Sequence, residues 1–220
     1  MSDVMADLET LSTRQHALFM SIGAVAFDPR GSRVNRDPGN VFYQNVDIVS
    51  AQRAGLHVDG ETIVWWFKQS DAARSAFKDP APRPIDEVLE SFARWYKQHT
   101  DRSSFVWSHG ATFDIPILTE AFQRVGMKAP WFYSRVHDTR TLFDLVGVKL
   151  PPADLRAGGH NALHDAIAQA EHVQLCTKRI FALAGAIPQQ SEGDPRDEAV
   201  EPVVDSDAAD GASADAEIVI

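Results

Sequence analysis

The chain has little cysteine and no long apolar run. Its 220 residues include one cysteine, Cys176, which excludes an intramolecular disulfide and favours a reducing compartment. No apolar run approaches the roughly 18 residues of a membrane span, and the first residues lack the basic and apolar regions of a secretory signal. We therefore expect a cytoplasmic protein with no membrane association.

Basic residues are too few to hold a polyanion by charge alone. The 21 Lys and Arg residues face 31 Asp and Glu residues, which gives a formal net charge of −10. Residues 191–220 hold ten of the acids and the single base Arg196, so this stretch carries −9. The remaining 20 bases and 21 acids leave residues 1–190 at −1, a balance that tolerates nucleic acid without attracting it strongly.

The composition predicts one folded domain followed by a tail. Apolar residues make up 44% of the chain, which is enough for a sizeable core. Residues 189–220 consist mainly of Ser, Gly, Asp, Glu, Pro and Ala, with too few large apolar groups to offset the entropy lost on ordering. We expect a folded domain over residues 1–188 and an acidic disordered tail over 189–220.

The spacing of apolar residues predicts an α/β fold. Alternation and turn signals predict strands at 4–8, 18–27, 40–48, 105–108 and near 136. Helical spacing predicts helices at 61–69, 71–77, 84–99, 115–125, 139–146 and 161–184. The first three strands form an antiparallel meander, whereas the later alternation of strand and helix favours parallel pairing. The expected architecture is a mixed sheet flanked by helices.

Asp7 and Glu9 stand at the end of the first predicted strand. Because side chains alternate along a strand, both carboxylates project from the same face. Two such groups repel each other unless a proton or a cation lies between them, and they can share a divalent cation. The same spacing recurs at Asp59 and Glu61, so a solvated strand end is the alternative interpretation.

Asp114 follows the strand predicted at 105–108 and opens the next helix. Open α/β folds collect their ligands at the carboxyl ends of the strands, which makes Asp114 a candidate ligand. The alternative is a helix cap, because Asp is among the best N-cap residues. The two roles do not exclude each other.

His160 and Asp165 belong to the segment GGHNALHD, which opens the last predicted helix. Asp165 lies about 125° from the centre of the apolar stripe of that helix, so we expect it to face a cleft. The two side chains converge only if His160 precedes the helix, which Gly158 and Gly159 favour. A hydrogen-bonding role at the helix start is the alternative for His160.

Taken together, Asp7-x-Glu9, Asp114 in SHGATFD and His160-x-x-x-x-Asp165 occur in the order of the motifs of the DEDD 3′-to-5′ exonucleases. Over residues 3–184 the chain resembles the histidine subtype, the DEDDh exonucleases of the ribonuclease H-like superfamily. The stretch 61–77 is most similar to small stand-alone bacterial and phage exoribonucleases. The resemblance implies a ribonuclease H-like α/β fold and a metal-dependent nuclease.

The resemblance also implies roles for these residues. Asp7, Glu9 and Asp165 would hold the metal that activates water, Asp7 would bridge to a second metal, and Asp114 would support that second metal. Two Mg²⁺ or Mn²⁺ ions supply the nucleophile and the charge stabilisation that phosphodiester hydrolysis needs. His160 is the expected general base, since an imidazole titrates near neutral pH.

Residues near the motifs are candidates for substrate contacts. In the family, the residues after Asp-x-Glu contact the terminal nucleotide, which implicates Thr10 and Leu11. Phe113, Trp65 and Trp66 could stack on bases, an interaction that contributes about 1 to 3 kcal/mol per base without sequence preference. Packing of a helix on the sheet is the alternative for one of the two tryptophans.

The predicted function is removal of nucleoside 5′-monophosphates from the 3′ ends of single-stranded RNA. Single-stranded DNA is the first alternative, because no local motif identifies a contact to the 2′-hydroxyl. Small members of the superfamily often dimerise, which makes a homodimer a reasonable expectation. Two other classes stay open: a metal-dependent mononucleotide phosphohydrolase, suggested by His137-Asp138 and by the His160/His164 spacing, and a non-catalytic nucleic-acid-binding module.

Overall fold

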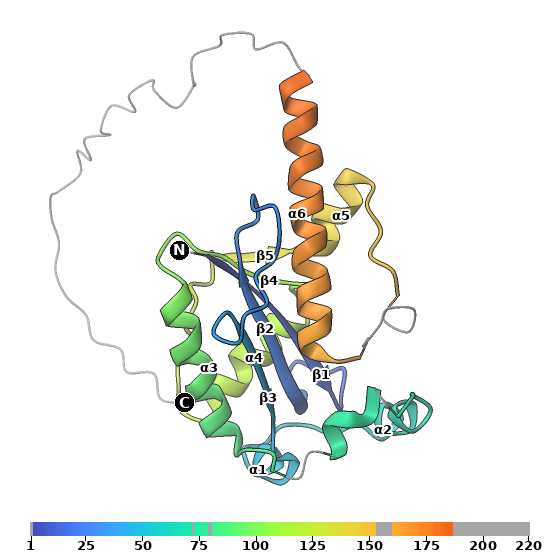
Figure 1. Ribbon diagram of the computed structural model, residues 1–220. Helices are drawn as coiled ribbons and strands as arrows, with labels where there is room; N and C mark the ends of the chain where they lie inside the picture. The colour runs from blue at the N-terminus through green and yellow to red at the C-terminus, as the bar shows by residue number, and fades with distance from the viewer. Residues whose placement is uncertain (1, 72, 79–80, 153–159, 187–220) are drawn as a thin grey trace, which may run out of the picture. The chain divides into compact units, whose positions relative to one another are not determined.

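A five-stranded sheet organises the chain in the computed structural model, which describes residues 2–71, 73–78, 81–152 and 160–186 (Figure 1). The strands are β1 (Asp3–Thr10), β2 (Phe19–Phe27), β3 (Val41–Asn45), β4 (Val106–Ser108) and β5 (Val136–Asp138), in the sheet order β3-β2-β1-β4-β5. The first three pair antiparallel, and β4 pairs parallel with both β1 and β5. The predicted mixed sheet is therefore confirmed. The predicted acidic tail, 189–220, lies outside the described residues.

Six α-helices and one 3₁₀ helix join the strands in the described part of the chain. They are α1 (Ile48–Arg53), α2 (Gly60–Phe67), the 3₁₀ helix η1 (Ala73–Lys78), α3 (Ile85–His99), α4 (Asp114–Arg124), α5 (Thr139–Val146) and α6 (Ala162–Ala186). The helix predicted at 71–77 is present as the 3₁₀ helix η1, which begins at Ala73 and ends at Lys78. The prediction missed α1, whose six residues are too few for a periodic signal.

The helices cover both faces of the sheet with two separate cores. Strand β1 contributes Val4, Ala6 and Leu8 to the core shared with α3 and α4. It contributes Met5 to a second core, which contains residues of α5 and α6. Because side chains alternate, Asp7 continues the face of Met5 and lies under α6.

The first turn of α6 lies directly on the backbone of β2. Gly23 is the register partner of Asp7, and a Cβ atom at Gly23 would lie 2.1 Å from the carbonyl carbon of Ala162 and 2.1 Å from the nitrogen of Leu163. Any side chain at this position would therefore push the helix away. Glycine at 23 brings the start of α6 next to Asp7.

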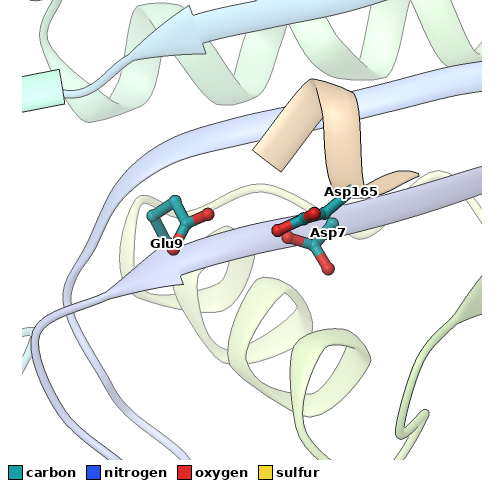
Figure 2. A group of neighbouring side chains, drawn as sticks. All are labelled: Asp7, Glu9 and Asp165. Carbon is teal, nitrogen blue, oxygen red and sulfur yellow. The ribbon is translucent and has the colours of Figure 1, made fainter. Parts of the chain in front are cut away.

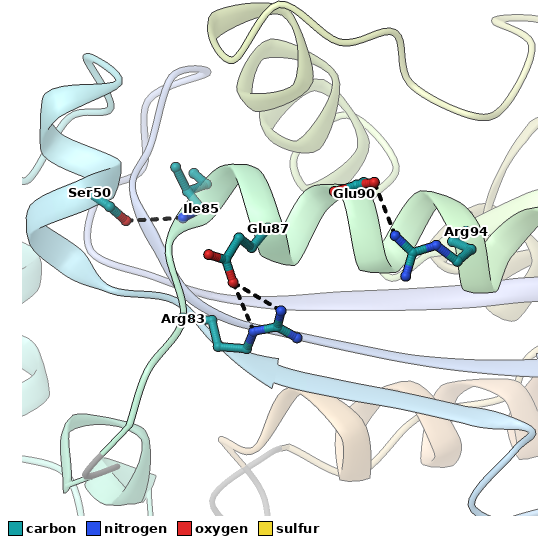
Figure 3. Close-up of polar contacts among 6 residues, drawn as sticks. All are labelled: Ser50, Arg83, Ile85, Glu87, Glu90 and Arg94. Atoms are coloured by element: carbon teal, nitrogen blue, oxygen red, sulfur yellow. Dashed lines mark hydrogen bonds and ion pairs between the residues drawn. The ribbon is translucent and has the colours of Figure 1, made fainter.

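Polar contacts at its start and along its exposed side accompany the packing of helix α3, as Figure 3 shows, whereas α6 lies directly on a strand backbone. The Ser50 hydroxyl of α1 accepts a hydrogen bond from the Ile85 N–H, at 3.0 Å, and so satisfies a free donor at the start of α3. Two ion pairs follow along its exposed side, Arg83 with Glu87 and Arg94 with Glu90. Pairs of this kind contribute only about 0.3 to 0.5 kcal/mol each, so α3 depends mainly on its apolar face.

No helix in the described ranges combines the length and the apolar character that crossing a bilayer requires.

Candidate active site

Three carboxylates gather where β1 meets the start of α6. Asp7 and Glu9 come from β1, and Asp165 reaches toward Asp7 from the first turn of α6 (Figure 2). One oxygen from each lies within 4.8 Å of the others. Glu9 and Asp165 are buried, and Asp7 is partly buried. Hard oxygen donors at this spacing are the ligand set that Mg²⁺ and Mn²⁺ prefer.

Asp114 is a fourth carboxylate near this cluster. It is the first residue of α4 and is 5% exposed, while Phe113 occupies the N-cap position without a side-chain capping bond. Burial raises the pKa of Asp114 to about 7, although the Ser108 hydroxyl and the positive charge of Arg140 act in the opposite direction. The predicted cap role is therefore not the one seen, and the side chain lies close enough to Asp7 to affect its charge.

Burial, together with the neighbouring carboxylates, governs the electrostatics of Asp7. Burial raises the pKa of Asp7 well above its usual range, and the carboxylates of Asp114, Glu9 and Asp165 raise it further. One hydrogen bond opposes this rise, donated by Nε2 of Gln169 to Oδ1 of Asp7 at 2.7 Å. Three acids that raise the proton affinity of a fourth fit a bound divalent cation, which would replace protons as the compensating charge.

His160 lies just before α6, as convergence with Asp165 requires. Its backbone has φ of +61°, a left-handed conformation that is unusual outside glycine. Its N–H donates to Oδ2 of Asp165 at 3.1 Å. The imidazole lies edge-on to Trp65 and Trp66, with ring centroids 5.3 and 6.2 Å apart. Gly158 and Gly159, which were expected to support this entry, lie outside the described residues.

A cavity of about 450 Å³ opens beside Glu9. Its lining residues are Leu8, Glu9, Thr10, Thr13, Glu61, Thr62, Trp65 and Trp66. Trp66 is 3% exposed and donates through Nε1 to the Thr10 carbonyl at 2.8 Å, so it mainly braces the wall. Trp65 is 42% exposed and presents more of its ring. The cavity therefore combines an aromatic wall with a carboxylate of the acidic cluster.

The predicted substrate contacts differ in how exposed the structure leaves them. Leu11 is 1% exposed and belongs to the apolar core; it follows Thr10, the last residue of β1, so the alternation of the strand does not fix its direction. Leu11 is therefore unavailable to a nucleotide in this conformation. Phe113 packs against the same core while partly exposed. Thr10 lines the cavity, and its hydroxyl donates to the Ser12 carbonyl at 2.9 Å.

Sequence reasoning missed two residues of this region, Gln169 and Gly23. Gln169 follows Asp165 by one helical turn, so the same face of α6 carries both, but a lone glutamine gives no signal of its own. Gly23 lies in a strand interior, where glycine often marks a close approach of another backbone. That signal was present in the sequence.

The phosphohydrolase alternative does not fit the structure. Its fold is all-helical, whereas this chain has the five-stranded sheet. Asp138 caps α5 by accepting from the Arg140 N–H, and His137 stacks on Phe105 with centroids 3.8 Å apart, so both residues of the His-Asp pair have structural roles. Among the described residues, Asp7, Glu9 and Asp165 form the one group of three or more potential metal ligands, and it contains no histidine.

Solved structures share this fold at low sequence identity. The chain is similar to cell-death related nuclease 4 (TM-score 0.57, 14% identity, 80% of this chain and 64% of that one). It is also similar to the nuclease domain of 3′hExo, a DEDDh family member bound to rAMP (0.50, 13%, 80% and 93%). A third similar structure is S. pombe Pop2p in its Mg²⁺- and Mn²⁺-bound form (0.50, 13%, 82% and 84%).

Sequence comparison finds one curated nuclease and one family of nuclease domains. An exodeoxyribonuclease of Enterobacteria phage T4 is 26% identical over 134 residues, and the match spans 57% of each protein. The description "3′-5′ exoribonuclease Rv2179c-like domain" belongs to a family model that matches residues 2–177. The chain therefore belongs to the Rv2179c-like family of 3′-5′ exoribonuclease domains.

Proposed function

We propose that the chain is a 3′-to-5′ exoribonuclease that releases nucleoside 5′-monophosphates by metal-dependent hydrolysis. The observation that carries the proposal is the cluster of Asp7, Glu9 and Asp165, with oxygens within 4.8 Å, beside Asp114 and His160. Membership of an exoribonuclease family supports it. The Mg²⁺ and Mn²⁺ described for S. pombe Pop2p support divalent cations as the cofactor.

The four carboxylates suit two divalent ions, Mg²⁺ or Mn²⁺, because their combined charge balances +4. Asp7, Glu9 and Asp165 would hold one ion, and Asp7 and Asp114 would hold the other. When bound, such ions lower the pKa of water and stabilise negative charge on the phosphate and the leaving oxygen. Asp7, in the middle of the set, would contact both.

His160 would accept the proton of the attacking water at a ring nitrogen. Its backbone N–H is engaged by Asp165, which ties the position of the histidine to that of a metal ligand. The edge-on tryptophans limit how far the ring can rotate. A carboxylate committed to a cation is a poor proton acceptor, so the imidazole is the suitable base.

The cavity beside Glu9 would bind the 3′-terminal nucleotide. Trp65 would stack on its base, with Trp66 behind it, and Thr10 would lie near the terminal ribose. Stacking suits a chain whose first 190 residues carry little net charge, because it contributes about 1 to 3 kcal/mol per base without basic groups.

Hydrolysis of a 5′-labelled single-stranded RNA and its DNA counterpart tests this proposal. We expect a ladder that shortens from the 3′ end with Mg²⁺ or Mn²⁺, disappears in chelator, and disappears in Asp165→Asn and His160→Ala. Asp144→Asn, at an exposed carboxylate of α5, is the matched control and should cleave normally. No cleavage of either polymer would refute the proposal, whereas faster cleavage of DNA would favour the alternative that the phage relative suggests.

Three further properties belong to the same proposal. We expect a homodimer, which sedimentation velocity would detect. We also expect a cytoplasmic location and a preference for unpaired 3′ ends, measured by fractionation and by comparing single-stranded with blunt duplex RNA.

A further inference from the structure

A buried glutamine contacts the central carboxylate of the acidic cluster. Gln169 of α6 donates from Nε2 to Oδ1 of Asp7 on β1 at 2.7 Å, a short hydrogen bond between positions 162 residues apart in the chain. Gln169 is 2% exposed. The contact is therefore shielded from water, where a hydrogen bond to a charged group contributes more than it does at the surface.

The surroundings of Gln169 do not explain a polar residue there. Its neighbours along α6, Ala166, Ala170 and Val173, are fully buried in an apolar core. Its own carbonyl oxygen, Oε1, is buried with no hydrogen-bond partner among the described residues. A buried acceptor without a partner costs about 1 to 3 kcal/mol, so an apolar side chain would suit the packing better.

The orientation of the amide follows from the chemistry of Asp7. In the structure the NH₂ group of Gln169 faces Asp7, which is the orientation that a carboxylate acceptor requires, and Oε1 is buried on the other side of the amide. The donor is also neutral. A lysine or arginine at this position would neutralise Asp7 and repel a cation, whereas the amide fixes the carboxylate and leaves its negative charge available.

We propose that Gln169 is a positioning residue that holds the Asp7 carboxylate in the orientation required for divalent metal binding. The inference rests on the proposed metal-binding role of Asp7. By occupying one lone pair of Oδ1, Gln169 limits rotation of the carboxylate and directs the remaining lone pairs to the cluster of Glu9 and Asp165. Partners of this kind typically change metal affinity or activity by about 10- to 100-fold.

The chain offers a matched control on the same helix. Gln174 is 3% exposed, and its Nε2 donates to the backbone carbonyl of Asp28 at 2.9 Å, away from the acidic cluster. Replacing either glutamine by methionine keeps the side-chain volume and helix propensity similar and removes the donor. Only Gln169→Met also removes a contact to a proposed metal ligand.

The test is Mn²⁺ binding to full-length protein, measured by titration calorimetry together with the unfolding temperature in chelator. Because Gln169→Met removes a buried hydrogen bond and an unpartnered buried carbonyl together, we expect its unfolding temperature in chelator to change little and its Mn²⁺ binding to weaken about 10- to 100-fold. Its cleavage of RNA should recover as Mn²⁺ is raised. Gln174→Met should lower the unfolding temperature and leave Mn²⁺ affinity unchanged.

The inference fails if Gln169→Met binds Mn²⁺ within twofold of the unsubstituted chain, or if Gln174→Met weakens binding equally. Should Gln169→Met not fold, Gln169→Leu, which also lacks the donor, replaces it in the same titration. If the unsubstituted chain itself bound no Mn²⁺, the proposed metal site would fail, and that result is distinct from the failure of Gln169 alone.

Discussion

The two long helices α3 and α6 pack on opposite faces of the same sheet in different ways. The buried residues of α3 are mostly large, namely Ile85, Val88, Leu89, Phe92, Trp95 and Tyr96. Helix α6 buries small residues at every fourth position, Ala162, Ala166 and Ala170, together with the polar Asp165 and Gln169. Large side chains bury much apolar surface but keep the helix backbone farther from the sheet. Small side chains bury less surface and let the helix backbone lie close to the strands. We infer that α3 mainly stabilises the fold and that α6 mainly positions the site.

The largest effect on the α6 side is expected from Asp7→Asn. Loss of a central metal ligand should reduce kcat/KM on labelled RNA by on the order of 10³-fold. The same change should raise the unfolding temperature in chelator, because it removes the carboxylate that burial and its neighbours disfavour. Activity within tenfold of the unsubstituted chain would break the assignment of Asp7.

On the α3 side, Phe92→Ala should lower the stability of the fold and leave the activity of the folded protein unchanged. Phe92 is fully buried and packs against Phe42 and Trp95, so its truncation should cost about 3 to 5 kcal/mol of unfolding free energy. The fraction that remains folded should cleave RNA with unchanged kcat and Mn²⁺ affinity. Denaturant unfolding and assays at low temperature measure the two quantities separately, and a large change in Mn²⁺ affinity would contradict the comparison.

Gly23→Ala tests whether the site needs the close approach of α6 to β2. The added methyl group would meet the α6 backbone at 2.1 Å and displace its first turn, which carries Asp165. We expect kcat/KM to fall about 10²-fold, as for other small misplacements of catalytic groups. Gly39→Ala, at a position where an added Cβ meets nothing within 4 Å, is the control. Equal kcat/KM values for Gly23→Ala and Gly39→Ala would show that catalysis does not need the close approach of α6 to Gly23.

The pH dependence of stability should differ with and without metal. Asp114 has its pKa raised to about 7 in the folded chain, and that of Asp7 is also raised, so the folded state binds more protons than the unfolded state between about pH 4 and 7. Stability in chelator should therefore fall as pH rises through this range, by about 5 °C in unfolding temperature. Mn²⁺ should reverse the trend, and Asp114→Asn should flatten it. Thermal scans from pH 5 to 8 provide the measurement.

The smallest expected effect is that of Trp65→Ala. Loss of one stacking surface should raise KM for RNA by about tenfold, which corresponds to the lower half of the stacking range, and leave kcat nearly unchanged. Trp66→Ala should instead destabilise the chain, because that indole is buried and bonded to Thr10. A larger KM change in a folded Trp66→Ala variant would assign the stacking role to Trp66, the other tryptophan that the sequence offered as a candidate.

The sequence predicted those parts of the site that depend on local pattern. Asp7 and Glu9 share a face because strand side chains alternate, and the strand and helix order was visible in apolar spacing. The contact of Gln169 with Asp7 was not predictable, since it joins residues 162 positions apart. The burial of Leu11 was not predictable either, because Leu11 lies just beyond the end of β1, where the alternation of the strand no longer applies. Contacts between distant parts of the chain and the direction of side chains beyond strand ends were therefore the features that the sequence did not predict.

The wide separation of β1 and α6 in the chain has a consequence for protein synthesis. A growing polypeptide acquires Asp7 and Glu9 first, then Asp114, and receives Asp165 and Gln169 only when α6 is made. Until that helix leaves the ribosome and docks on β2, the acidic cluster lacks one of its members. A nascent nuclease of this design would stay inactive beside its own messenger RNA until its folded domain is nearly complete.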